Sequence, residues 1–207
     1  MLLSKELNFI FIHIYKNAGT SIRQSLLPIA NQVMQTRMNV ESWLDINAQT
    51  YDLMPYPAHI SASEVIQEIG QSVFDSYYSF AVVRNPWDWQ VSLYNFMYHH
   101  SDHPLHEEIR GIGGFDNYID SLCTRRISQQ KLFICSEEGR LLVDKVLRFE
   151  NICLDFSDVC SELGIRASLQ HANAFSHDNY REYYSQRSID SVAAVFREDI
   201  EFFGYDF

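Results

Sequence analysis

The feature that most constrains this fold is an apolar run that leads into a polar loop and then into a helical pattern. Residues 9–12 (FIFI) are apolar and rich in β-branched and aromatic side chains, which predicts a strand buried on both faces. Residues 15–18 (YKNA) form the loop, and apolar residues at helical intervals over 22–29 predict a helix that starts near Gly19. The stretch therefore predicts a strand, a short loop and a helix N-terminus in direct succession.

Such a succession can hold a phosphate or a sulfate. The first turn of a helix has unpaired N–H donors and a partial positive charge. Lys16 adds a mobile full charge, Gly19 lets the backbone approach an anion closely, and Thr20 and Ser21 add hydroxyl donors. An ordinary turn with a surface lysine is the alternative that the loop alone leaves open.

The position of the lysine limits which kind of ligand the loop is expected to bind. A nucleoside-triphosphate P-loop reads G-x-x-x-x-G-K-[ST], with the lysine directly after the last glycine. Here Lys16 precedes Gly19, and Ile14 stands where the first glycine would be. No acidic strand end that could hold magnesium accompanies the loop, so we expect it to bind an anion without a metal.

A second stretch has the same strand-to-helix form. Residues 80–83 (FAVV) predict a buried strand, and Arg84 follows at its carboxyl end. Asn85 is a suitable N-cap for a helix that has Pro86 at its first position. Ser92 lies roughly two turns into that helix, and a guanidinium matches a phosphate through two parallel hydrogen bonds. The alternative is that Arg84 pairs with a carboxylate and Ser92 lies on a solvated face.

Both stretches resemble motifs of sulfotransferases that use 3′-phosphoadenosine 5′-phosphosulfate (PAPS). Residues 11–21 (FIHIYKNAGTS) resemble the 5′-phosphosulfate loop of the carbohydrate-type group, which typically reads FIHIPKTAGTS. Tyr15 replaces the proline that rigidifies that loop. Residues 83–94 (VRNPWDWQVSLY) resemble the 3′-phosphate motif and keep its arginine and serine eight positions apart.

The resemblance implies an α/β fold with a central parallel sheet flanked by helices, the P-loop NTPase-like sulfotransferase fold. It implies transfer of a sulfuryl group from PAPS to an acceptor hydroxyl, without a metal. Arg181, in a YREYY stretch that the family uses to close over the nucleotide, is a further candidate, with a surface aromatic cluster as the alternative. The predicted donor-binding residues are Lys16, Asn17, Ala18, Gly19, Thr20, Ser21, Arg84, Ser92 and Arg181.

The predicted catalytic residues are Lys16, which would stabilise transition-state charge, and His59, which would act as general base. A histidine titrates near working pH, and family members carry one between the two phosphate motifs. A capping or packing role for His59 stays open. His13 is a weaker candidate, because we expect it inside the buried strand, and Glu64 is a fallback whose helix-capping role competes.

Three functions remain in competition. The first is a sulfotransferase whose acceptor hydroxyl, as the resemblance implies, belongs to a carbohydrate or a glycolipid; a small metabolite or a tyrosine is the alternative acceptor. The second is a P-loop-like small-molecule kinase, which the position of Lys16 argues against. The third is a nucleotide-binding module with weak or no catalysis, which Tyr15 makes plausible.

Composition limits the class of protein. At 207 residues with 46% hydrophobic content, the chain is expected to form one domain, 1–207. A net charge of −11 argues against nucleic acid as a partner. Four cysteines without CxxC pairing suggest scattered core thiols in a reducing compartment. Since no apolar run approaches about 20 residues, we expect a cytoplasmic protein without a transmembrane segment.

Further elements follow from local patterns. Ser61 and Glu64 form a capping box for a helix that Gly70 ends. A strand is predicted over 143–149, and one C-terminal helix is predicted from the apolar positions between Ile189 and Phe203. A helix beginning at Phe115 and a helix with an apolar face at Phe156, Val159, Cys160 and Leu163 are also predicted.

Two segments have weaker signals. Residues 32–57 are a guess for the acceptor-facing part of the chain. Residues 99–106 hold four histidines, but Pro104 interrupts helical spacing and no HExxH pattern forms. We expect a solvated, pH-sensitive loop there rather than a metal site.

Overall fold

A computed structural model describes residues 1–30, 59–124, 128–169 and 179–207. The chain divides into two compact units. The first covers Met1–Val83 and Phe133–Ala172, and the second covers Arg84–Leu132 and Asn173–Phe207. The guessed acceptor segment, 32–57, lies outside the described residues.

The first unit is built on a sheet of four strands in the order β1-β2-β3-β4. The strands are β1 (Leu2–Ser4), β2 (Phe9–Ile12), β3 (Tyr78–Val83) and β4 (Lys145–Arg148). The strands β2, β3 and β4 run parallel, whereas β1 pairs with β2 antiparallel. The predicted α/β class and the parallel core of the sheet are confirmed. The edge strand β1 was not predicted. Because it runs antiparallel to β2, the sheet is mixed.

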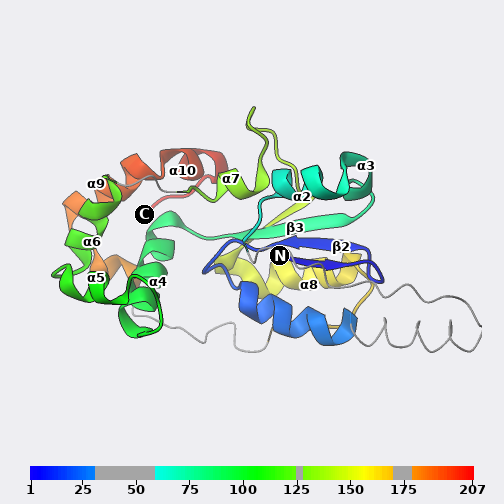
Figure 1. The fold of residues 1–207 in the computed structure, drawn as a ribbon, viewed down its shortest axis with the longest axis horizontal. Coiled ribbons are helices and arrows are strands. Elements are labelled where there is room, and N and C mark those ends of the chain that lie inside the picture. Colours follow the sequence, from blue (N-terminus) through cyan, green and yellow to red (C-terminus); the bar gives the residue numbers. More distant parts are fainter. Residues whose placement is uncertain (31–58, 125–127, 170–178) are drawn as a thin grey trace, which may run out of the picture. The chain divides into compact units, whose positions relative to one another are not determined.

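Helices cover both faces of this sheet (Figure 1). Residues 19–30 are helical and pack with α8 (Ile152–Glu162) on one face, while α2 (Ala62–Ile69) and α3 (Gln71–Phe74) lie on the other. The core on the first face is wholly apolar and joins alternate strand residues to helix residues, among them Phe9, Phe11, Phe80, Val82, Ile22, Leu26, Phe156 and Val159. Successive side chains of a strand point to opposite faces, and because helices cover both faces of the sheet, every residue of β2 is buried.

The second unit is helical. Its elements are α4 (Pro86–His99), α5 (His106–Gly111), α6 (Phe115–Leu122), the 3₁₀ turn η2 (Tyr180–Tyr183), α9 (Gln186–Val195) and α10 (Arg197–Phe203). Between them in the chain lie the short α7 (Lys131–Ile134) and, in the first unit, the 3₁₀ turn η1 (Phe149–Asn151). The predicted helix at Phe115 is confirmed, and its apolar side chains are buried.

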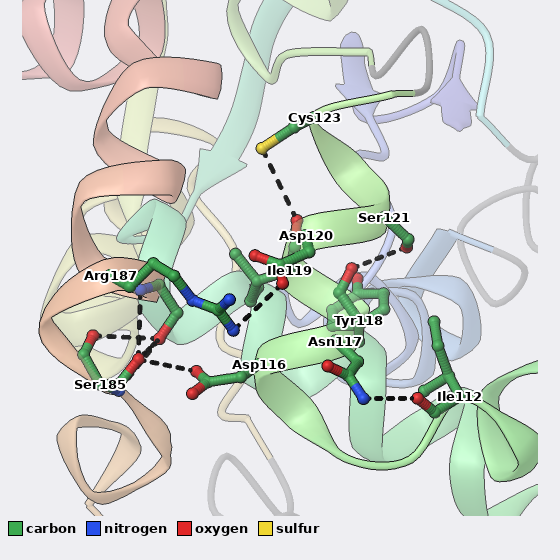
Figure 2. Close-up of polar contacts among 11 residues, drawn as sticks. Ile112, Asp116, Asn117, Tyr118, Ile119, Asp120, Ser121, Cys123, Ser185 and Arg187 are labelled. Carbon is green, nitrogen blue, oxygen red and sulfur yellow. Dashed lines mark hydrogen bonds and ion pairs between the residues drawn. The ribbon is translucent and has the colours of Figure 1, made fainter.

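Polar contacts hold α6 and α9 together in the second unit (Figure 2). The hydroxyl of Ser185 donates to Oδ1 of Asp116 at 3.1 Å, and Arg187 pairs with Asp120 at 3.1 Å. Ser185 also forms the N-terminal capping box of α9 with Ser188. Hydrogen bonds from Ser188 and Ser185 lower the pKa of the Asp116 carboxyl.

Two predicted elements differ from those observed. The strand predicted over 143–149 is shorter, since Phe149 already belongs to the 3₁₀ turn. The single C-terminal helix is two helices, because Phe196 leaves helical geometry at φ −103° and ψ 23°. Phe196 packs its ring against Trp89 there, with centroids 5.8 Å apart. The helical spacing of apolar residues continues across Phe196, so the sequence pattern does not reveal the break between the two helices.

The structure tests two further predictions, the burial of the cysteines and the absence of a transmembrane segment. All four cysteines are unbridged; Cys135 and Cys160 are buried, but Cys123 and Cys153 are exposed, so the expectation that all four are core residues is wrong for these two. Within the described ranges, no helix has both the length and the apolar character to cross a membrane.

Candidate functional site

The predicted anion loop follows β2 directly. Lys16 and Ala18 both have left-handed backbone conformations, with φ of 62° and 58°. Such angles are uncommon for residues other than glycine and are found most often where a local geometry is functionally required. The helix begins at Gly19, and the N–H of Ile22 donates to Ala18 O at 3.0 Å. The loop thus turns tightly into a helix N-terminus, where unpaired N–H groups favour an anion.

Asn17 anchors this loop to the sheet. Its side chain is buried at 1% exposure, and Nδ2 donates to Val82 O of β3 at 2.9 Å. Thr20 is exposed and Ser21 is partly exposed. The Asn17 side chain therefore has a structural task, and a contribution of Asn17 to anion binding has to come from its backbone.

His13 packs directly beneath the start of the helix. It follows the end of β2 and so lies outside the strand in which it was expected. A Cβ atom at Gly19 would lie 1.8 Å from Nε2 of His13, so only glycine fits there. Burial, with the nearby charges of His59, the amino terminus and Arg23, lowers the pKa of His13 to about 3. His13 is therefore a neutral packing residue near neutral pH.

His59, the predicted base, packs against two residues that follow β2, His13 and Tyr15. It is exposed, and its Nδ1 lies 3.0 Å from the backbone oxygen of His13. A carbonyl oxygen only accepts, so Nδ1 carries the proton and Nε2 of the neutral ring keeps its lone pair. The ring centroids of His13 and Tyr15 lie 4.6 and 5.7 Å from that of His59. These contacts orient an imidazole whose Nε2 can accept a proton.

Arg84 opens the second unit and is buried at 4% exposure. Its Nε donates to Oδ2 of Asp88 at 2.6 Å, which is the carboxylate pairing that the sequence left open. Ser92, on the same helix α4, is also buried and not on a solvated face. As predicted, Asn85 caps α4 by accepting from the N–H of Trp87, and Pro86 is the first helical residue.

Arg181 is exposed on the turn η2. Its guanidinium lies over two aromatic rings of the second unit, 4.7 Å from the centroid of Tyr180 and 5.6 Å from that of Phe207. This is the aromatic cluster that was the alternative to a nucleotide contact. Attraction between the cation and the two π faces favours this position of the guanidinium.

Histidines of the segment at 99–106 contact backbone groups of α4 and of the segment itself. Nδ1 of His100 lies 2.9 Å from Phe96 O, and Nδ1 of His106 lies 3.1 Å from Met97 O. Nδ1 of His103 accepts from the N–H of Leu105. Across the described part of the chain, no three His, Cys, Asp or Glu side chains are grouped to hold a metal ion.

Sequence reasoning missed one buried residue beside Arg84. Gln130 was noted only as part of a loop, yet it is fully buried and both ends of its side-chain amide bond the Arg84 backbone. An uncharged glutamine in a loop has no local pattern that reveals such a contact. The one feature of the sequence that could have drawn attention to this contact is the pair of adjacent glutamines, Gln129 and Gln130, in the loop.

Comparisons with known proteins test which family this chain belongs to. A search of curated proteins found no match. A crystal structure of mouse sulfotransferase SULT7A1 complexed with PAP is similar to this chain with 10% sequence identity and a TM-score of 0.47, covering 96% of this chain and 85% of that one. A sequence model of the sulfotransferase family matches residues 1–206. This match confirms the assignment made from the loop at 11–21 and the motif at 83–94: the chain belongs to the sulfotransferase family.

Proposed function

We propose that this chain transfers a sulfuryl group from PAPS to a hydroxyl of an acceptor, and that the acceptor is a carbohydrate or a glycolipid. Family membership supports sulfuryl transfer. The observation that carries the proposal is the loop in which Lys16 and Ala18 take left-handed conformations just before a helix N-terminus. The carbohydrate acceptor rests on the likeness of residues 11–21 to the loop of carbohydrate-type enzymes.

The anion loop would take the 5′-phosphosulfate. Lys16 and the backbone N–H groups of residues 17–21 would bind its oxygens and stabilise the charge that develops on the leaving phosphate. Arg84 and Ser92 would bind the 3′-phosphate and orient the donor for attack. Arg181 is assigned a weaker nucleotide contact.

His59 would act on the acceptor. The acceptor oxygen attacks sulfur, the bond from sulfur to the phosphate oxygen of the donor breaks, and adenosine 3′,5′-bisphosphate leaves. The hydroxyl proton passes to Nε2 of His59, whose lone pair is available because Nδ1 donates to His13 O. No step of this sequence needs a metal.

The donor site is tested by calorimetric titration with adenosine 3′,5′-bisphosphate, with ATP and magnesium as the comparison ligand. We expect wild type to prefer the bisphosphate and Arg84→Ala to weaken its binding at least tenfold. Arg187→Ala is the matched control, since it removes the same charge from the same unit, where the Arg187 guanidinium pairs with Asp120 (Figure 2). A preference for ATP with magnesium would replace this proposal with the kinase.

The catalytic step is tested with labelled PAPS and a panel of hydroxyl acceptors. We expect His59→Ala to reduce transfer by about 10²-fold or more, as for loss of a general base, with unchanged affinity for adenosine 3′,5′-bisphosphate. Tight binding of the bisphosphate, no transfer to any acceptor and no effect of His59→Ala would identify a binding module without catalysis.

A further inference from the structure

Gln130 makes an unusual two-point contact with the backbone of Arg84. Its Oε1 accepts from the Arg84 N–H at 2.9 Å, and its Nε2 donates to the Arg84 carbonyl at 2.8 Å. Gln130 is 0% exposed and Arg84 is 4% exposed, so both bonds are shielded from water. The amide thus satisfies both backbone groups of one residue, as a neighbouring strand would.

Asp199 in turn holds Gln130. The two oxygens of its carboxylate accept from the backbone N–H groups of Gln130 and Lys131 at 2.7 and 2.8 Å. Asp199 lies on α10 and is 0% exposed. Charge-assisted bonds of this kind are stronger than neutral ones, and more so away from water. A buried carboxylate therefore places Gln130, and Gln130 places the backbone of Arg84.

The direction of the Arg84 side chain is set separately, by the bond from Nε to Asp88. A guanidinium recognises a phosphate through two parallel N–H bonds, which tolerate little misplacement. Backbone position and side-chain direction are thus controlled by two different residues. Asp88 belongs to the same helix as Ser92, whereas Gln130 lies outside that helix, directly before α7.

We infer that Gln130 is a positioning residue for recognition of a nucleotide 3′-phosphate, acting through the backbone of Arg84. The inference rests on the proposed function, since it presumes that Arg84 binds the 3′-phosphate of the donor. Loss of the two hydrogen bonds from the Gln130 side chain lets the Arg84 backbone shift, so the binding free energy that a 3′-phosphate contributes becomes smaller. Groups that bind the rest of the nucleotide are unaffected.

The test compares two ligands that differ only in the 3′-phosphate. Affinities for adenosine 3′,5′-bisphosphate are measured by calorimetry, and those for adenosine 5′-monophosphate by displacement of the bisphosphate. In wild type, the dissociation constant of the monophosphate divided by that of the bisphosphate measures how much the 3′-phosphate contributes to affinity. Gln130→Met has a similar side-chain length and no amide, and we expect it to reduce that ratio at least tenfold while leaving the monophosphate affinity within about twofold.

Gln129→Met is the matched control. Gln129 also makes two backbone hydrogen bonds, to Val195 O and from the Asp199 N–H, but neither involves Arg84. We expect it to keep the wild-type ratio even if it lowers stability. Gln130→Glu keeps the acceptor for the Arg84 N–H and loses the donor, so it tests the same claim if Gln130→Met does not fold, with a smaller fall in the ratio expected.

The outcomes separate the two proposals. A wild-type ratio near one, or no binding of the bisphosphate, would overturn the proposed donor site and this inference with it. A large wild-type ratio that Gln130→Met and Gln130→Glu leave unchanged would overturn only the role of Gln130. Equal weakening of both ligands would show that Gln130 supports the fold rather than 3′-phosphate recognition.

Discussion

Gly19 and His13 show how one residue pair sets the shape of the anion loop. Gly19 is not in a left-handed conformation, so available space, and not backbone freedom, is what requires glycine. The imidazole of His13 occupies the position where a Cβ would stand. The ring also stacks on Phe11, with centroids 5.8 Å apart, which limits how far it can move away.

We therefore expect Gly19→Ala to lower the free energy of unfolding by about 2–3 kcal/mol, as overpacking does, and to abolish measurable binding of adenosine 3′,5′-bisphosphate. His13→Ala removes the obstructing ring, so the double variant should lose less stability than the sum of the single variants. Urea unfolding of all four proteins gives the coupling energy, which we expect to exceed about 1 kcal/mol. Additive losses would show that the two residues do not compete for the same space.

At the scale of elements, α2 illustrates a prediction that local sequence supports fully. The hydroxyl of Ser61 accepts from the N–H of Glu64, and the Glu64 carboxylate accepts from the Ser61 N–H at 2.8 Å. The Ser61 hydroxyl also donates to the Glu64 carboxylate at 2.7 Å, and this bond, together with the one from the Ser61 N–H, lowers the pKa of Glu64. The helix ends at Ile69, with Gly70 at φ 87°, as its sequence position predicts. The capping role of Glu64 also argues against its use as the fallback base.

Loss of this cap should have a measurable cost. We expect Ser61→Ala to lower the free energy of unfolding by about 1 kcal/mol, because an N-cap bond is lost. Ser63→Ala, at the second position of α2, is the matched control and should be neutral or slightly stabilising through helix propensity. Chemical denaturation monitored by circular dichroism measures both. Equal effects of the two variants would mean that the capping box contributes nothing.

For the whole molecule, the buried Asp199 couples stability to pH. Its pKa is raised from 3.8 to about 6, chiefly by burial and to a smaller extent by Glu198, while the backbone N–H groups of Lys131 and Gln130 and the charge of Lys131 oppose the rise. The folded state then holds a proton that the unfolded state has released between about pH 4 and pH 6. Unfolding free energy must therefore fall as pH rises through this window.

A shift of about two units corresponds to roughly 3 kcal/mol. We expect the unfolding free energy of wild type, relative to Asp199→Asn, to decrease by about 2–3 kcal/mol between pH 4 and pH 6.5. Urea titrations at a series of pH values measure it, with Glu198→Gln as a control for a neighbouring exposed charge. A difference that does not vary with pH would show that Asp199 is ionised throughout the window in the folded state.

Local sequence determined the parts of this protein that depend on neighbours in the chain. The strand and loop at 9–18, the cap and proline that start α4, and the capping box of α2 all follow from short-range rules of periodicity, backbone angle and capping. The two motifs at 11–21 and 83–94 also sufficed to predict the family. Residue roles within them remain predictions.

Tertiary structure decided what depends on residues distant in the chain. The proton of His59 is placed on Nδ1 by His13 O, and the backbone of Arg84 is held by Gln130, in both cases across 46 positions. The antiparallel edge strand β1 and the break at Phe196 likewise need partners, Phe9–Ile12 and Trp89, that no local pattern specifies. A hydrogen bond or ring contact is defined by the position of both partners, and only the folded chain brings these partners together.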